Sequence, residues 1–140
     1  MDKPFYRSSQ EVFDYLYHSM RGLNTEVFKV IFLDVQNQVI AVEDLFEGTL
    51  TASSVYPREI IKSAIKHNAA SLIFAHNHPS GNPAPSESDK EITRDLLLAA
   101  SVMQIEVLDH IIIGENKYFS FADEGLIEEF ELNVMSLRRT

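Results

Sequence analysis

Apolar residues recur at helical spacing near the start of the chain. Three of them lie four positions apart and therefore share one face of a helix: Val12, Leu16 and Met20. Ser8 followed by Glu11 has the spacing of a capping box, in which each residue satisfies a backbone N–H of the other. We therefore expect a first helix over about residues 9–21.

Two later stretches show the same amphipathic spacing. The first opens at Pro57, where a proline costs no helical hydrogen bond, and runs to His67. The second runs from Ser86 to Met103. The residues expected to face the core are Ile60, Ile61, Ala64 and Ile65 in the former, and Ile92, Leu96, Ala99 and Met103 in the latter.

Short runs of β-branched and aromatic residues between these stretches predict strands. Glu26 to Asp34 is apolar on nearly both faces, as is typical of a central strand. Ala70 to Ala75 is a short apolar strand that delivers two histidines at its carboxyl end. Three more strands are expected at Val39 to about Phe46, Val107 to Ile113 and Lys117 to Phe121.

The order helix–strand–strand–helix–strand–helix–strand–strand predicts a mixed α/β fold in which helices pack on a β-sheet. The residues after Gly125 are acidic and only weakly helical in pattern. The 140 residues show no repeat, low-complexity tract or internal linker, so we expect one domain over residues 1–140.

Composition limits the possible partners and ligands. The net charge of −9, from 21 acidic and 12 basic residues, would repel DNA phosphates, so direct nucleic-acid binding by this chain alone is expected to be weak. Folding could still assemble a basic patch from Arg58, Lys62, Lys66 and the pair Arg138–Arg139. The chain has no cysteine, so any metal must be held by nitrogen and oxygen atoms.

The sequence also bears on location. It contains no apolar run of the roughly 18 residues that a membrane-spanning helix requires. Its first residues, MDKPFY, lack the basic and apolar regions of a secretory signal. We therefore expect a cytoplasmic protein without a membrane anchor.

The stretch from His76 to Asp89 carries the candidate chemistry. His76 and His78 are two positions apart on an extended segment, so their rings point the same way. A Pro/Gly-rich loop separates them from Asp89, at the start of the third helix, and can fold back to bring the three side chains together. Two imidazoles and one carboxylate leave a zinc ion one open position for water. The sequence predicts a hydrolytic zinc site, with Ser86 facing the open position as a hydrogen-bond donor.

Each of these residues also has a purely structural interpretation. Two loop histidines can make ordinary hydrogen bonds, and Ser86 and Asp89 have the spacing of a helix cap. A cap does not exclude a site, because the first helical turn holds its side chains rigidly. The letters HNH at positions 76–78 match the name of a nuclease motif whose residues are normally separated in sequence, and we attribute that match to coincidence.

Several motifs together resemble one family. The pattern His76-x-His78-Pro79, with Ser86 and Asp89, resembles the signature of the JAMM (MPN) metallopeptidases. The fuller string AHNHPSGNPAPSESD resembles the RadC-like branch of bacterial proteins, as do EVFKVIFLD, LFEGTL, VYPREIIKSAI and VLDHIIIG. The resemblance covers about residues 26–125 and implies the JAMM/MPN fold, which is cytidine-deaminase-like. Long RadC-like proteins also carry an upstream helix-hairpin-helix domain, for which the residues before the first strand leave no room here.

The resemblance also implies a catalytic glutamate at the start of an early central strand. Glu26 matches that position, and Glu43, in the second strand, is the alternative. Either could simply be a solvated strand residue, and a general base must reach the attacking water. We favour Glu26. His110 is expected either to be an ordinary strand-edge histidine or to form part of the site wall, with Asp109 fixing its tautomer.

The resemblance therefore implies a zinc-dependent hydrolase that cleaves an amide or isopeptide bond in a peptide or protein substrate. His76, His78 and Asp89 would hold Zn²⁺, Glu26 would act as general base, and Ser86 would stabilise the oxyanion. Two alternatives are a DNA-repair or mobile-element accessory protein in which zinc is only structural, and a metal-dependent nuclease. The sequence indicates neither the physiological substrate nor the oligomeric state.

Overall fold

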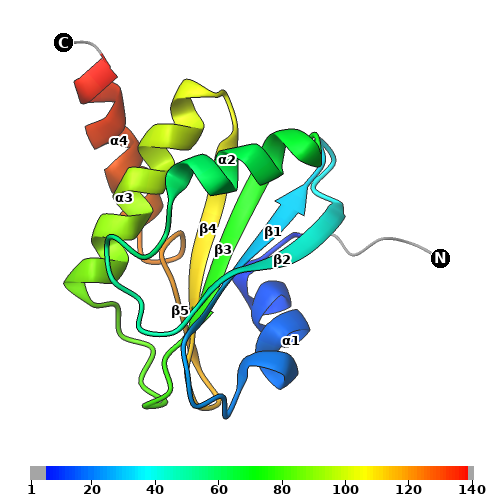
Figure 1. Cartoon of the computed structure of the whole chain (residues 1–140), viewed down its shortest axis with the longest axis vertical. Helices are drawn as coiled ribbons and strands as arrows, with labels where there is room; N and C mark the ends of the chain where they lie inside the picture. Colours follow the sequence, from blue (N-terminus) through cyan, green and yellow to red (C-terminus); the bar gives the residue numbers. More distant parts are fainter. Residues whose placement is uncertain (1–5, 139–140) are drawn as a thin grey trace.

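The computed structural model describes residues 6–138 as a five-stranded sheet with helices on both faces (Figure 1). The fold predicted from the sequence pattern, a mixed sheet flanked by helices, is confirmed. In chain order the elements are α1 (Ser9–Met20), β1 (Val27–Leu33), β2 (Val39–Glu47), α2 (Pro57–Lys66), β3 (Ser71–Asn77), α3 (Glu87–Val102), β4 (Glu106–Ile113), β5 (Tyr118–Ser120) and α4 (Leu126–Arg138).

The sheet has the strand order β2-β1-β3-β4-β5 and is mixed. Its only parallel pair, among the described strands, is β3 with β4, and α3 makes the crossover between them. In the register of the central strands, Phe28 of β1 is opposite His76, and His76 is opposite Ile112 of β4. The carboxyl end of β3 therefore lies in the middle of the sheet, beside the start of β1.

Two apolar clusters hold the layers together. Alternate residues of β1 point to opposite faces. Phe28, Val30 and Phe32 join the cluster under α2, α3 and α4, whereas Ile31 and Leu33 join the cluster under α1. Thus, of the helices within the described residues, α1 alone covers one face, and α2, α3 and α4 cover the other. No helix among residues 6–138 is long and apolar enough to cross a bilayer.

The helical stripes differ in part from those expected. Ile60 and Ala64 of α2 are buried, but Ile65 is 60% exposed. In α3 the buried residues are Ile92, Thr93, Leu96, Leu97 and Ala100, together with Asp89, while Met103 is 46% exposed. The predictions for Ile65 and Met103 were wrong because α2 lies at the margin of the helical layer and Met103 follows the last turn of α3, so neither side chain has a neighbour to cover it.

The loop after β3 is anchored by backbone hydrogen bonds to the end of β4. His78 N–H donates to Ile113 O at 3.0 Å, and Glu115 N–H donates to Gly81 O at 2.8 Å. A Cβ at Gly114 would lie 2.4 Å from Gly81 O, so only glycine fits where the two segments cross. These contacts turn the Pro/Gly-rich segment back toward α3.

Candidate metal centre

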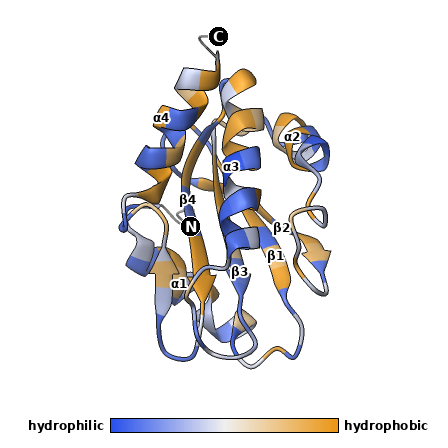
Figure 2. Ribbon diagram, turned by 90° about the vertical axis from the view of Figure 1, so that its left-hand side faces the viewer, coloured by the Kyte–Doolittle hydropathy of each residue, from blue (hydrophilic) through white to orange (hydrophobic). Residues whose placement is uncertain are grey.

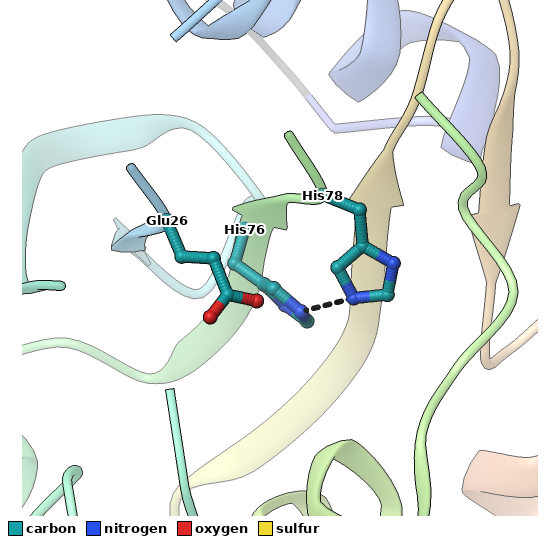
Figure 3. Close-up of side chains that lie close together, drawn as sticks. All are labelled: Glu26, His76 and His78. Carbon is teal, nitrogen blue, oxygen red and sulfur yellow. Dashed lines mark hydrogen bonds between the residues drawn. The ribbon is translucent and has the colours of Figure 1, made fainter. Parts of the chain in front are cut away.

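The candidate centre lies where the start of β1, the end of β3 and the first turn of α3 meet. Asn77, between the two histidines, ties β1 to this point. Its side-chain oxygen accepts from Val27 N–H at 2.8 Å, and its amide donates to Thr25 O at 3.0 Å. Both chain neighbours of Glu26 are thereby fixed to β3, and Figure 3 shows the Glu26 carboxylate beside His76.

Three side chains bring ligand atoms to one point. His76 Nε2 and His78 Nε2 are 3.1 Å apart, His78 Nε2 is 3.0 Å from Asp89 Oδ2, and His76 Nε2 is 3.2 Å from Asp89 Oδ1. Donor atoms 2.0–2.1 Å from a common zinc ion at tetrahedral angles would lie about 3.3 Å apart. His76 and Asp89 are buried and His78 is partly exposed, so the point opens to solvent on one side.

A chain of hydrogen bonds determines which nitrogen of His76 is free. Thr93 Oγ1 donates its only proton to Asp89 O at 2.8 Å. Its 2.6 Å contact with His110 Nδ1 must therefore be donated by the ring. His110 Nε2 then carries no proton and accepts from His76 Nδ1–H at 2.8 Å. This leaves His76 Nε2 without a proton. Its lone pair is therefore available to a metal ion at the point where the three side chains converge.

His78 is oriented in the same sense by the loop. Its Nδ1 lies 2.9 Å from Asn82 O, which can only accept, so Nδ1 carries the proton and Nε2 is left with its lone pair. Burial opposes the charged form of Asp89, but protonated rings of His76 and His78 would donate to it, and this attraction, together with the Ser86 N–H, holds the pKa of Asp89 well below its usual range. Two lone pairs and a carboxylate facing one another can be satisfied together by a cation.

Glu26 completes the group from the opposite side. Its carboxylate and the two imidazoles offer ligand atoms that all lie within 4.8 Å of one another. Leu50 N–H donates to Glu26 Oε2 at 2.7 Å and orients the carboxylate. Glu43, the alternative in the sequence, lies elsewhere. Its Oε1 is 2.6 Å from His67 Nε2 at the end of α2, and that hydrogen bond lowers the pKa of Glu43.

Ser86 is the N-cap of α3, as its spacing from Asp89 predicted. Ser86 Oγ accepts from Asp89 N–H at 3.0 Å, and Ser86 N–H donates to Asp89 Oδ2 at 2.8 Å. Asp89 takes part both in this cap and in the convergence with the two histidines, so the cap does not exclude the predicted site. Ser86 is exposed and contacts Asp89, one of the three convergent side chains.

Asp109 does not fix the tautomer of His110, contrary to expectation. Successive strand residues point to opposite faces, so the Asp109 carboxylate cannot reach the ring. It accepts instead from Ser120 Oγ at 2.7 Å and from the backbone N–H groups of His110 and Ala122. Burial raises the pKa of Asp109 to about 6. Burial also lowers the pKa of His110 well below its usual value, which keeps the ring neutral.

A small polar cleft adjoins the centre. It has a volume of about 210 Å³ and is lined by Asn24, Thr25, Glu26, Gly48, Thr49 and Pro79. Glu26 thus lies between the convergent donors and a space open to solvent.

Comparisons with known proteins show the family of this chain. The family model for the RadC-like JAB domain matches residues 6–126. A UPF0758 protein of Pseudoalteromonas translucida is 54% identical over 122 residues, which are 87% of this chain and 54% of the relative. A UPF0758 protein of Symbiobacterium thermophilum is 53% identical over 116 residues, 83% of this chain and 50% of the relative. The chain therefore spans about half the length of the curated relatives it matches, and it belongs to the RadC family, as a RadC-like JAB domain.

Proposed function

We propose that this chain is a zinc-dependent hydrolase that cleaves an amide or isopeptide bond. The observation that carries the proposal is the convergence of His76 Nε2, His78 Nε2 and the Asp89 carboxylate at mutual distances of 3.0–3.2 Å. The hydrogen-bond chain through Thr93 supports it, because it leaves His76 Nε2 ready to bind a cation.

The donor set fits zinc better than the hard cations. Magnesium and calcium prefer oxygen ligands, whereas two imidazoles and one carboxylate are the ligands of many catalytic zinc sites. Three protein ligands leave one position for water or substrate, and the partly exposed side of His78 faces solvent. Zinc bound there would supply an acidified water and polarisation of the substrate carbonyl.

The side chains around that position would transfer protons between the water and the leaving group, and would stabilise the negative charge that develops on the substrate oxygen. Glu26 would accept a proton from the attacking water and deliver it to the leaving amine. The Leu50 N–H bond to Oε2 supports this role, because it orients the carboxylate and leaves Oε1 for exchange. The Ser86 hydroxyl accepts from Asp89 N–H, so its own proton is available for the developing oxyanion.

The substrate class follows from the same region. The cleft beside Glu26 is lined by polar residues that include Asn24, Thr25 and Thr49, and a polar, open cleft suits an extended peptide better than a compact metabolite. We therefore propose a peptide or protein substrate.

Glu26→Gln separates the general base from the ligands. The variant should keep about one zinc per chain and the parent fold, but lose hydrolysis of isopeptide-linked model substrates by about 10²- to 10⁴-fold. Asp89→Ala should lose most of the zinc. Glu43→Gln is the matched control and should behave like the parent.

The outcomes also separate the alternatives. Parent protein that holds no transition metal when purified without chelator would contradict the zinc proposal. Zinc bound with no hydrolysis in the parent would favour an accessory protein with a structural ion. Metal-dependent DNA cleavage that Glu26→Gln removes would favour the nuclease.

A further inference from the structure

Exposed apolar side chains gather on the helical layer formed by α2, α3 and α4. Among the described residues, seven of the ten exposed large apolar side chains belong to it: Ile65, Leu98, Val102, Met103, Leu132, Met135 and Leu137. Figure 2 looks onto α3, with α2 and α4 on its two sides. Apolar groups concentrated on one face of a molecule mark an interaction surface.

A groove of about 610 Å³ runs between α2 and α3 on this layer. Its lining combines apolar side chains with two basic ones, and includes Ile61, Ile65, Val102, Met103, Arg58 and Lys62. Arg58, Lys62 and Lys66 are four positions apart and form a basic stripe along α2. In a chain with a net charge of −9 such a stripe is unusual, and it favours an acidic, apolar occupant.

One exposed face of α4 has that character, and two of its residues, Glu131 and Met135, also line the crevice toward α3. Glu128, Glu131, Leu132 and Met135 have the spacing of one helical face, and all four are exposed. Burial and the neighbouring carboxylates of Glu106 and Glu128 raise the pKa of Glu131. Cations placed against this face would relieve the repulsion among these carboxylates.

We propose that two copies of this chain form a symmetric dimer in which α4 of each copy lies in the α2–α3 groove of the other. Groove and acidic face lie on the same helical layer with α3 between them, so a two-fold axis over α3 brings both pairs together at once (Figure 1). Arg58 and Lys62 face Glu128 and Glu131 across each half of the interface. None of the candidate metal ligands lines the groove, so the proposal is independent of the proposed function.

Two charge-reversed variants test the pairing. Arg58→Glu/Lys62→Glu makes the groove acidic, and Glu128→Lys/Glu131→Lys makes α4 basic. Each variant alone juxtaposes like charges in both halves, so the dimer dissociation constant should rise about 100-fold or more. An equimolar mixture of the two should dimerise again, because an acidic groove then meets a basic α4 and a basic groove meets an acidic α4.

The measurement is molar mass by sedimentation or light scattering over a concentration series, with circular dichroism of each variant to verify folding. Lys117→Glu, an exposed lysine on the β4–β5 turn, is the control and should dimerise like the parent. A parent that stays monomeric overturns the proposal and leaves the groove to a different acidic partner. A parent dimer that survives both reversals, or two monomeric variants that fail to associate when mixed, overturns it as well.

Discussion

At the scale of single residues, Thr93 influences the candidate metal centre although it is not one of the candidate ligands. Its hydroxyl proton goes to a backbone carbonyl, so it can only accept from His110. Through His110 it determines that the His76 nitrogen next to Asp89, Nε2, carries no proton. Partners of metal-binding histidines set ring orientation and basicity, and their loss typically weakens metal binding by 10- to 100-fold.

Thr93→Val should therefore weaken zinc binding by about 10- to 100-fold without removing any candidate ligand. Valine keeps the shape of threonine but leaves His110 Nδ1–H buried without an acceptor, so the free energy of unfolding should also fall by about 1–3 kcal/mol. Competition with a chromophoric chelator measures the affinity. Thr93→Ser keeps the hydroxyl and is the control; equal affinity in Thr93→Val and the parent would contradict the hydrogen-bond chain.

Asp109 predicts a pH dependence of stability. Burial raises its pKa from 3.8 to about 6, so the folded protein binds this proton more tightly than the unfolded chain. The resulting stabilisation is complete below pH 3.8 and is lost as the pH rises through about 6, which amounts to about 3 kcal/mol. Asp109→Asn removes the ionisation while keeping an acceptor for His110 N–H and Ala122 N–H.

Relative to the parent, Asp109→Asn should therefore gain stability as the pH rises through this window. Urea unfolding of both proteins at pH values on either side of it gives the difference. Asp123, an exposed neighbour whose charge also raises the pKa of Asp109, supplies the control variant Asp123→Asn, which should have a smaller effect. Parallel pH curves for Asp109→Asn and the parent would rule out this role.

Sequence reasoning found the convergent side chains but not the groups that orient them. The spacing of His76, His78 and Asp89 carried a chemical signal, and the structure brings their ligand atoms together. Thr93 and Asn77 carried none. A threonine in an amphipathic helix looks like any other, and its contact with His110 depends on how α3 lies against β4.

At the scale of elements, the position of the loop between β3 and α3 depends on its contact with the backbone at Gly114, just after β4. That loop carries His78 and leads into the helix that presents Asp89. Backbone hydrogen bonds from both sides fix the crossing. The loop thus meets the end of β4 at a defined point, where Gly114 has no side chain.

Gly114→Ala should disturb the centre without touching a ligand. The added Cβ would lie 2.4 Å from Gly81 O, so the loop must shift. We expect a loss of about 1–3 kcal/mol in the free energy of unfolding, together with weaker zinc binding. Gly22→Ala is the control, because its positive φ is strained but nothing lies within 4 Å. If both variants lose stability but keep equal zinc affinity, the loop does not position the ligands.

The sequence predicted the element boundaries to within a few residues, except for α4, whose stretch showed only a weakly helical pattern and was not counted as an element. It did not predict which side chains at the margins are buried. Periodicity reports which residues share a face, but not whether a neighbouring element covers it. Ile65 and Met103 share faces with buried residues, yet both remain exposed beside the α2–α3 groove. Strand β3 extends through His76 to Asn77 because β1 and β4 pair with it there, which local pattern alone does not report.

At the scale of the whole molecule, charge predicts weak DNA binding. Arg58, Lys62 and Lys66 form a short stripe against a net charge of −9, while Arg139 lies outside the described residues. Three phosphate contacts would give a salt slope no steeper than about −2.7, at about 0.9 per phosphate. Fluorescence anisotropy with duplex DNA over a salt series measures it. Tight binding at about 150 mM salt with a much steeper slope would favour the DNA-processing alternative.

Helix α1, which covers the opposite face of the sheet, determines at which residue an expressed fragment of this domain can begin. Val12, Leu16 and Met20 of α1 cover Ile73 and Ile111, among other apolar strand residues. A fragment that starts at Asn24 would keep every candidate ligand yet present that strand surface to water, and we expect it to aggregate on expression. Fragments of this chain should remain dispersed only when their first residue precedes α1, and light scattering of fragments with stepped starting points measures where that boundary lies.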